Sequence, residues 1–155
     1  MKIKRVFSNN RKKNFVLETK DHALVFPYSE LKIKPSGDDP IVGVYVDVEL
    51  ANEGFTYTLR SGKEDSVLID EVLHYNQDPE YLREQMLHEL TAKALRALNA
   101  KKISKRELAR KLKTSPRHLY RLLDPAFYGK TIDQMARLLH ALGLRVELRI
   151  NKDAA

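Results

Sequence analysis

The sequence predicts an α+β protein, in which a small antiparallel β-rich domain (residues 1–77) precedes an all-α domain (residues 78–155) that ends in a strand. Two observations support this prediction. Apolar residues before residue 77 form short runs or alternate with polar residues, whereas after it they recur at helical spacing. At the junction, Asp78-Pro79 supplies a helix cap and a proline at the first helical position.

The strands expected in the first domain are short. Residues 42–49 alternate, which places four valines on one face, and Phe55, Tyr57 and Leu59 continue the same period. A loop that contains proline and glycine, residues 34–40, divides the domain in the middle. The other expected elements are two strands around 15–17 and 23–26, a turn at 61–63, a returning strand at 67–69 and a short helix near 70–75.

The second domain begins with a long helix from residue 78 to about 99, and three capped helix starts follow it. Ser104 with Glu107 and Thr131 with Gln134 are capping boxes, and Ser115 stands before a proline. These starts predict short helices near 104–112, 116–123 and 131–142, ended by Asp124-Pro125 and Gly143. The expected inward-facing residues are Leu108, Ala109, Leu112, Leu119, Leu122, Met135, Leu138, Leu139 and Leu142.

Composition limits the class of protein. The chain has 155 residues, of which 43% are hydrophobic and 32% charged, as is typical of a globular protein. It has no cysteine, which excludes disulfides, zinc fingers and thiol catalysis. Because no apolar run reaches the roughly 20 residues of a membrane span and the N-terminus does not resemble a signal peptide, we expect a cytoplasmic protein without membrane contact.

The net charge of +7 is unevenly distributed. Basic residues are in excess before residue 38 and after residue 78, whereas acidic residues dominate between them. Most of the C-terminal excess lies between residues 101 and 130, where Glu107 and Asp124 are the only acidic residues. A concentrated basic patch is typical of a protein that binds a polyanion, although a solvated helical surface would give the same count.

Residues 103–112, continued through Leu142-Gly143-Leu144, resemble the helix-turn-helix of phage repressors and Cro (the XRE type). They resemble more closely the domains of antitoxin-type autoregulators, which often end in Ala-Leu-Gly followed by a strand, as residues 141–150 do. The resemblance covers residues 79–150 and implies a lambda-repressor-like arrangement of helices. These families commonly have glycine where Lys113 stands, and a lysine there adopts a positive φ at a cost of roughly 1 kcal/mol.

The resemblance also implies which residues contact DNA. Arg117 and Arg121, four residues apart, share one helix face, and the arginine fork fits O6 and N7 of guanine. Pro116 and Tyr120 complete the expected base-contacting set. The residues expected to contact phosphates are Lys105, Arg106, Lys113, Thr114, Ser115, His118 and Lys130.

Other candidate sites are weaker. The histidines have no metal-binding spacing, and the acidic pairs Asp38-Asp39 and Glu64-Asp65 stand beside turn glycines. We therefore expect no catalytic residue, no metal and no cofactor. The basic N-terminal residues indicate an edge strand protected by lysines, with an arm that enters the minor groove as the alternative (Lys2, Lys4, Arg5, Arg11, Lys12 and Lys13).

The favoured hypothesis is a sequence-specific, DNA-binding transcriptional regulator, a dimeric autorepressor or the antitoxin of a pair. Its partners would be double-stranded DNA, a second copy of the chain and, for an antitoxin, a basic toxin-like protein on the acidic segment 38–78. Either the β-rich domain or the apolar face of Leu144–Ile150 could form the dimer. The alternatives are an adaptor that binds protein or RNA through the helical domain and, with least support, an enzyme with its site in the first domain.

Overall fold

The computed structural model describes residues 1–152 and divides into two compact units, Met1–Leu82 and the chain from Arg83 onward. The fold is α+β, as the sequence predicts. The expected boundary at residue 77 lies just before helix α2 (Pro79–Lys101), which begins in the first unit and continues into the second. Asp78 caps this helix as predicted, because its Oδ1 accepts a hydrogen bond from the Tyr81 amide (2.9 Å).

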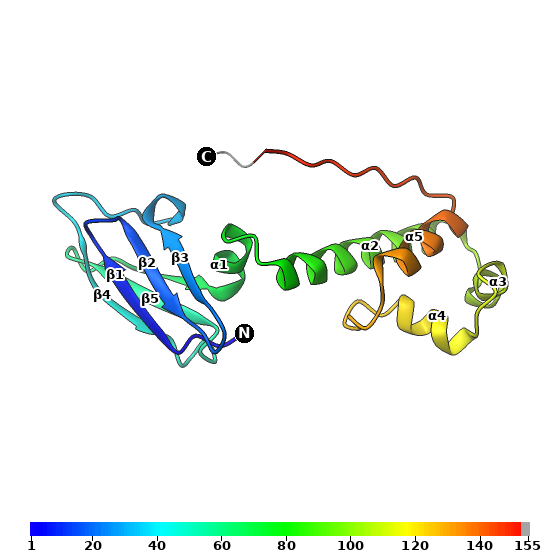
Figure 1. Cartoon of the computed structure of the whole chain (residues 1–155), viewed down its shortest axis with the longest axis horizontal. Helices are drawn as coiled ribbons and strands as arrows, with labels where there is room; N and C mark the ends of the chain where they lie inside the picture. The colour runs from blue at the N-terminus through cyan, green and yellow to red at the C-terminus, as the bar shows by residue number, and fades with distance from the viewer. Residues whose placement is uncertain (153–155) are drawn as a thin grey trace. The chain divides into compact units, whose positions relative to one another are not determined.

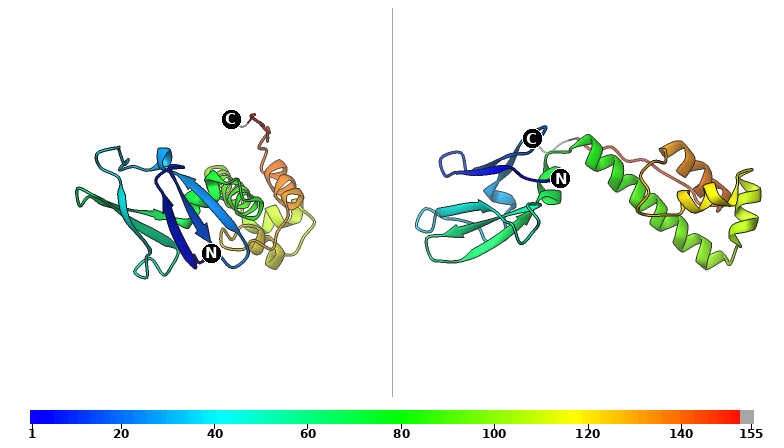
Figure 2. Two further views of the ribbon diagram at one scale, coloured as in Figure 1. Left: turned by 60° about the vertical axis from the view of Figure 1, so that its left-hand side comes forward. Right: turned by 90° about the horizontal axis from the view of Figure 1, so that it is seen from below.

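The first unit consists of two three-stranded antiparallel sheets that face each other across one core (Figure 2). Each sheet is a meander in which consecutive strands pair. The expected helix near residues 70–75 is confirmed as α1 (Ile69–Tyr75). The first sheet contains β1 (Arg5–Asn9), β2 (Asn14–Glu18) and β3 (Ala23–Pro27), followed by a 3-10 turn (Tyr28–Glu30), and the second contains β4 (Ile41–Val46), β5 (Gly54–Leu59) and β6 (Glu64–Leu68).

Aromatic side chains fill the space between the two sheets. The ring of Phe15, fully buried on β2, lies 4.8 Å from that of Phe55 and 5.6 Å from that of Tyr57, both on β5, and 4.9 Å from that of Tyr28. The Tyr57 hydroxyl donates a hydrogen bond to the Ile33 carbonyl (2.7 Å), so its polar end is satisfied inside the core. Phe55, Tyr57 and Leu59, which the sequence places on one face of a strand, are all buried, and Thr56 between them is buried as well.

The predicted face of four valines is confirmed only in part, since Val44 and Val46 pack against the core. Val42 and Val48, however, are 60% and 76% exposed, and the most buried residue of this strand is Ile41, which the alternation did not include. A shift of register between Ile41 and Gly43 bulges the strand, and Val48 lies beyond its end. The bulge displaces Val42 from the face that Val44 and Val46 share, which is why a strict period of two fails at this position.

The second unit contains the rest of α2 and three short helices, α3 (Lys105–Lys111), α4 (Pro116–Leu122) and α5 (Ile132–Ala141). All three predicted starts are confirmed. The hydroxyls of Ser104, Ser115 and Thr131 each accept a hydrogen bond of 3.1 Å from the amide three residues later. Thr131 and Gln134 form the full capping box, whereas no described bond returns from the Glu107 side chain to Ser104.

Leucine side chains form the core of the second unit, where α3, α4 and α5 gather around the C-terminal part of α2 (Figure 1). Every predicted inward-facing residue is buried except Leu112, which is partly buried against the same core. Helix α5 ends at Gly143 as predicted. The positive φ of this glycine (72°) lets its amide bond the His140 carbonyl and lets the Leu144 amide bond the Leu139 carbonyl.

The strand predicted at residues 144–150 is not formed. After Gly143 the chain is described as far as residue 152, and none of those residues belongs to a helix or a strand. A strand requires a second strand to accept and donate its backbone hydrogen bonds, and no described segment of the chain supplies one.

We expect Phe15→Ala to lower the free energy of unfolding of the first unit by about 3–5 kcal/mol, because it removes the ring against which three other aromatic rings pack. Phe7→Ala is the matched control, since Phe7 pairs with Val16 on the same hairpin but is 49% exposed. Urea unfolding followed by near-ultraviolet circular dichroism measures both variants. Equal losses would contradict the central position of Phe15.

Candidate nucleic-acid interface

Helices α3 and α4 are joined by the tight turn Leu112–Ser115. Lys113 has a positive φ (51°), as expected from the resemblance to helix-turn-helix families that commonly have glycine at this position. The turn is closed by hydrogen bonds from the Lys113 amide to the Arg110 carbonyl (3.1 Å) and from the Thr114 amide to the Ala109 carbonyl (3.0 Å). The small, buried side chain of Ala109 allows the two helices to approach closely.

Helix α4 has one buried face and one exposed face. Leu119 and Leu122 are buried in the core of the second unit, which fixes the rotation of the helix about its axis. The opposite side carries Arg117, Tyr120 and Arg121, all exposed, with Pro116 at the first helical position. The expected base-contacting residues therefore lie together on the surface of a helix that the core holds in place.

The surface of α3, the turn and α4 carries a high density of positive charge. Its seven exposed cations form no ion pair with any residue in the described part of the chain (Lys105, Arg106, Arg110, Lys111, Lys113, Arg117 and Arg121). The acidic residues within this stretch and just after it are Glu107 and Asp124, both exposed. We call these seven residues the basic surface.

One contact connects α3 with the exposed face of α4. The Lys105 ammonium lies 4.9 Å from the centre of the Tyr120 ring, within the range of a cation–π interaction. Lys105, which we expect to contact a phosphate, therefore lies next to Tyr120, which we expect to contact a base. Among the other expected phosphate contacts, Ser115 is exposed, while Thr114 and His118 are partly buried.

The expectation that Lys130 contacts phosphate is contradicted by its burial. Only 1% of this residue is exposed, and its ammonium donates hydrogen bonds to the Thr91 hydroxyl (2.6 Å) and to the carbonyls of Leu122 (3.0 Å) and Asp124 (2.8 Å). Burial lowers the pKa of Lys130, and the negative charge of Asp124 opposes that effect. A side chain held in this way has no access to a DNA backbone.

Two residues that the sequence did not single out support this arrangement. Thr91, buried on α2, donates its own proton to the Leu87 carbonyl (2.6 Å), so its oxygen is free to accept from Lys130. Arg83 donates to the carbonyls of Tyr128 (2.8 Å) and Lys130 (3.0 Å), which holds the loop before α5. No local sequence pattern identifies either residue, because both form hydrogen bonds with residues that are distant in the sequence.

The weaker candidates have structural roles. The carboxylate of Asp39 accepts hydrogen bonds from the amide and hydroxyl of Ser61 (both 2.7 Å), which lowers the pKa of Asp39 and closes the loop 34–40 onto a turn. Among residues 1–152, no group of acidic residues and histidines is arranged to hold a metal ion. Arg5 lies on the edge strand β1 and pairs with Glu18 on β2 (2.6 Å), and Arg11–Lys13 form the turn between these strands.

Comparison of the chain with family models, with curated proteins and with solved structures finds no match. Over residues 1–152, no helix has both the length and the apolar character that crossing a membrane requires.

We expect Lys130→Met to lower the free energy of unfolding of the second unit by about 2–3 kcal/mol, because the buried Leu122 carbonyl and the partly buried Asp124 carbonyl would lose a donor. Lys111→Met is the matched control, since Lys111 is exposed and has no described ion-pair partner. Urea unfolding followed by far-ultraviolet circular dichroism measures the loss of helix in both variants. If the two variants are equally stable, the buried ammonium does not support the unit.

Proposed function

We propose that this protein is a sequence-specific, DNA-binding transcriptional regulator and that α3 and α4 act as its helix-turn-helix. The observation that carries the proposal is the exposed face of α4, where Arg117, Tyr120 and Arg121 lie opposite two buried leucines. A short helix anchored on one side and carrying arginine forks on the other suits insertion into a major groove. The resemblance of residues 79–150 to repressor domains supports the same function.

In this proposal α4 is the recognition helix. Arg117 and Arg121 would each donate two hydrogen bonds to O6 and N7 of a guanine, and such contacts discriminate between bases by about 1–3 kcal/mol each. Pro116 and the Tyr120 ring would pack against neighbouring base edges. The contact with Lys105 restricts the Tyr120 ring before DNA binds, which reduces the entropy lost on binding.

The remaining cations of the basic surface would bind phosphates. Lys105 and Arg106 lie on α3, and Lys113 lies in the turn that leads into α4. The Ser115 oxygen already accepts the His118 amide, which leaves the hydroxyl proton free to be donated to a phosphate oxygen. Because each neutralised phosphate releases counterions, affinity should fall steeply as salt rises.

We further propose that the regulator binds as a dimer in the cytoplasm and represses its own gene. Proteins with a helix-turn-helix usually place two recognition helices in successive major grooves, about one turn of DNA apart. One basic surface offers only two arginine forks for bases, whereas two copies double the number of base pairs read.

We expect the protein to bind DNA from upstream of its own gene about 10³-fold more tightly than a scrambled duplex, and Arg117→Ala/Arg121→Ala to remove at least about 10²-fold of that preference. Titration by fluorescence anisotropy at two salt concentrations measures both effects. The matched control is Arg11→Ala/Arg60→Ala, which removes the same charge from two exposed positions of the first unit. Its preference for the upstream duplex should be unchanged.

Two results would contradict the proposal. Equal, weak and salt-sensitive binding to both duplexes would show that the basic surface is a general polyanion surface. A preference for the upstream duplex that survives in the α4 variant would show that other residues read the sequence.

A further inference from the structure

The chain after α5 runs as an extended segment whose backbone is unpaired. The Leu144 amide bonds the Leu139 carbonyl, but within the described chain no backbone bond is made by residues 145–152. Unpaired amides and carbonyls on an extended segment are a template for a further strand. We call residues 144–152 the tail.

The tail has an apolar face and a charged face. Val146 is 56% exposed, Leu148 81% and Ile150 86%, whereas the other large aliphatic side chains of the second unit are mostly buried. On the other face, Arg145 and Glu147 form an ion pair (3.2 Å), which shows that residues two apart point to the same side. Arg149 continues this charged face.

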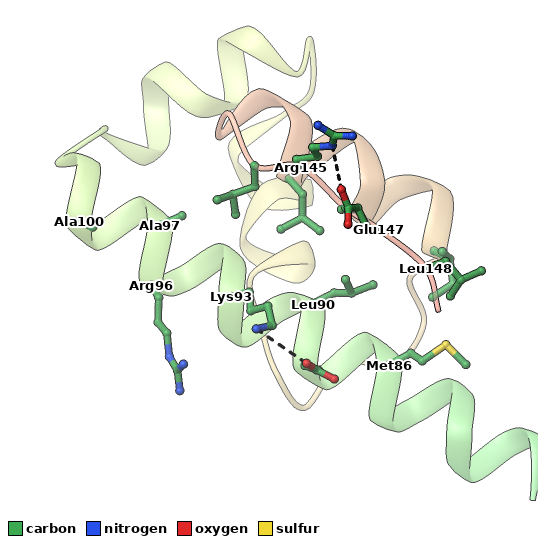
Figure 3. A pocket seen from close by; sticks show the side chains of 14 residues that line it. Met86, Leu90, Lys93, Arg96, Ala97, Ala100, Arg145, Glu147 and Leu148 are labelled. Atoms are coloured by element: carbon green, nitrogen blue, oxygen red, sulfur yellow. Dashed lines mark ion pairs between the residues drawn. The ribbon is translucent and has the colours of Figure 1, made fainter. Parts of the chain in front are cut away.

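Beside the tail lies a mainly apolar groove of about 760 Å³, with the ion pairs Glu89–Lys93 and Arg145–Glu147 among its lining residues (Figure 3). Its walls are α2, α5 and the tail itself, and its floor includes Leu90 and Leu139. Met86 on α2 and Ile132 on α5 border it and are 49% and 46% exposed. A groove of this composition next to an unpaired extended segment is typical of an interface rather than of a free surface.

We propose that a second copy of this chain covers the groove and that the two tails pair as an antiparallel ribbon. The apolar faces of both strands would then pack on Met86, Leu90 and Ile132, while the charged faces remain in water. The occupant is a second copy because the charges of the tail complement themselves. Arg145, Glu147 and Arg149 can supply both members of a cross-strand ion pair.

Charge also limits the register of the ribbon. A two-fold axis at Glu147 would oppose Glu147 with the partner's Glu147, and Arg145 with the partner's Arg149, which places like charges directly opposite each other. An axis at Val146 instead opposes Arg145 with the partner's Glu147. An axis at Leu148 opposes Glu147 with the partner's Arg149 and allows the longer ladder, over residues 144–152. The structure therefore favours an axis at Val146 or at Leu148.

The test is the molar mass of the full chain in solution, measured by sedimentation equilibrium without DNA. We expect the unmodified chain to be dimeric and Glu147→Arg to raise the dissociation constant of the dimer about 10-fold or more, because it converts two attractive pairs into repulsive ones. Leu148→Asp, which places a charge on the apolar face, should abolish the dimer. Glu49→Arg, the same charge change at an exposed turn of the first unit, should have no effect.

Charge swaps then identify the register. Adding Arg145→Glu to Glu147→Arg should restore the dimer if the axis is at Val146, and adding Arg149→Glu should restore it if the axis is at Leu148. Circular dichroism confirms that each variant is folded, as expected for residues outside the core. A monomeric unmodified chain, or a dimer that Leu148→Asp leaves intact, would overturn the inference. A monomeric chain would also contradict the dimer in the proposed function, whereas DNA recognition by α4 has its own test in the titration against the two duplexes.

Discussion

Lys130 places a positive charge inside the helical unit, and the position of α4 depends on the hydrogen bonds that the Lys130 ammonium donates. Its ammonium joins Thr91 on α2 to the carbonyls of Leu122 and Asp124, at the end of α4 and just after it. The last carbonyls of a helix have no hydrogen-bond partner within the helix. A buried cation that accepts this role stabilises the end of α4, and its bond to Thr91 connects that end to α2. The exposed arginines of α4 are therefore presented by a helix fixed at its C-terminal end by Lys130 and along its inner face by leucines.

Much of the helical unit could be predicted from the sequence because its signals are local. Caps at Ser104, Ser115 and Thr131 act over three residues, and a positive φ at Lys113 follows from one turn between two helices. The exposed face of α4 follows from the same register that buries Leu119 and Leu122. The burial of Lys130 could not be predicted in this way, because it depends on Thr91 on another helix.

In the β-rich unit the limits of prediction have a different cause. Phe55 and Tyr57 were expected on one face of a strand, and both lie in the core. The error at Val42 arises from a bulge, which depends on how β4 meets β5 and leaves no mark in the alternation. Residues 144–150 show the same dependence on a partner. Their alternation is correct for a strand, yet a strand forms only when a second one lies beside it.

The most direct test of DNA recognition by α4 is a selection of binding sequences from a random pool of duplex DNA, with the unmodified protein and with Arg117→Ala/Arg121→Ala. The account predicts that the unmodified protein enriches an inverted repeat, with guanines in half-sites about one turn of DNA apart, and that the variant loses those guanines. A pool that stays random after selection, or the same enriched sequence with both proteins, would contradict the account.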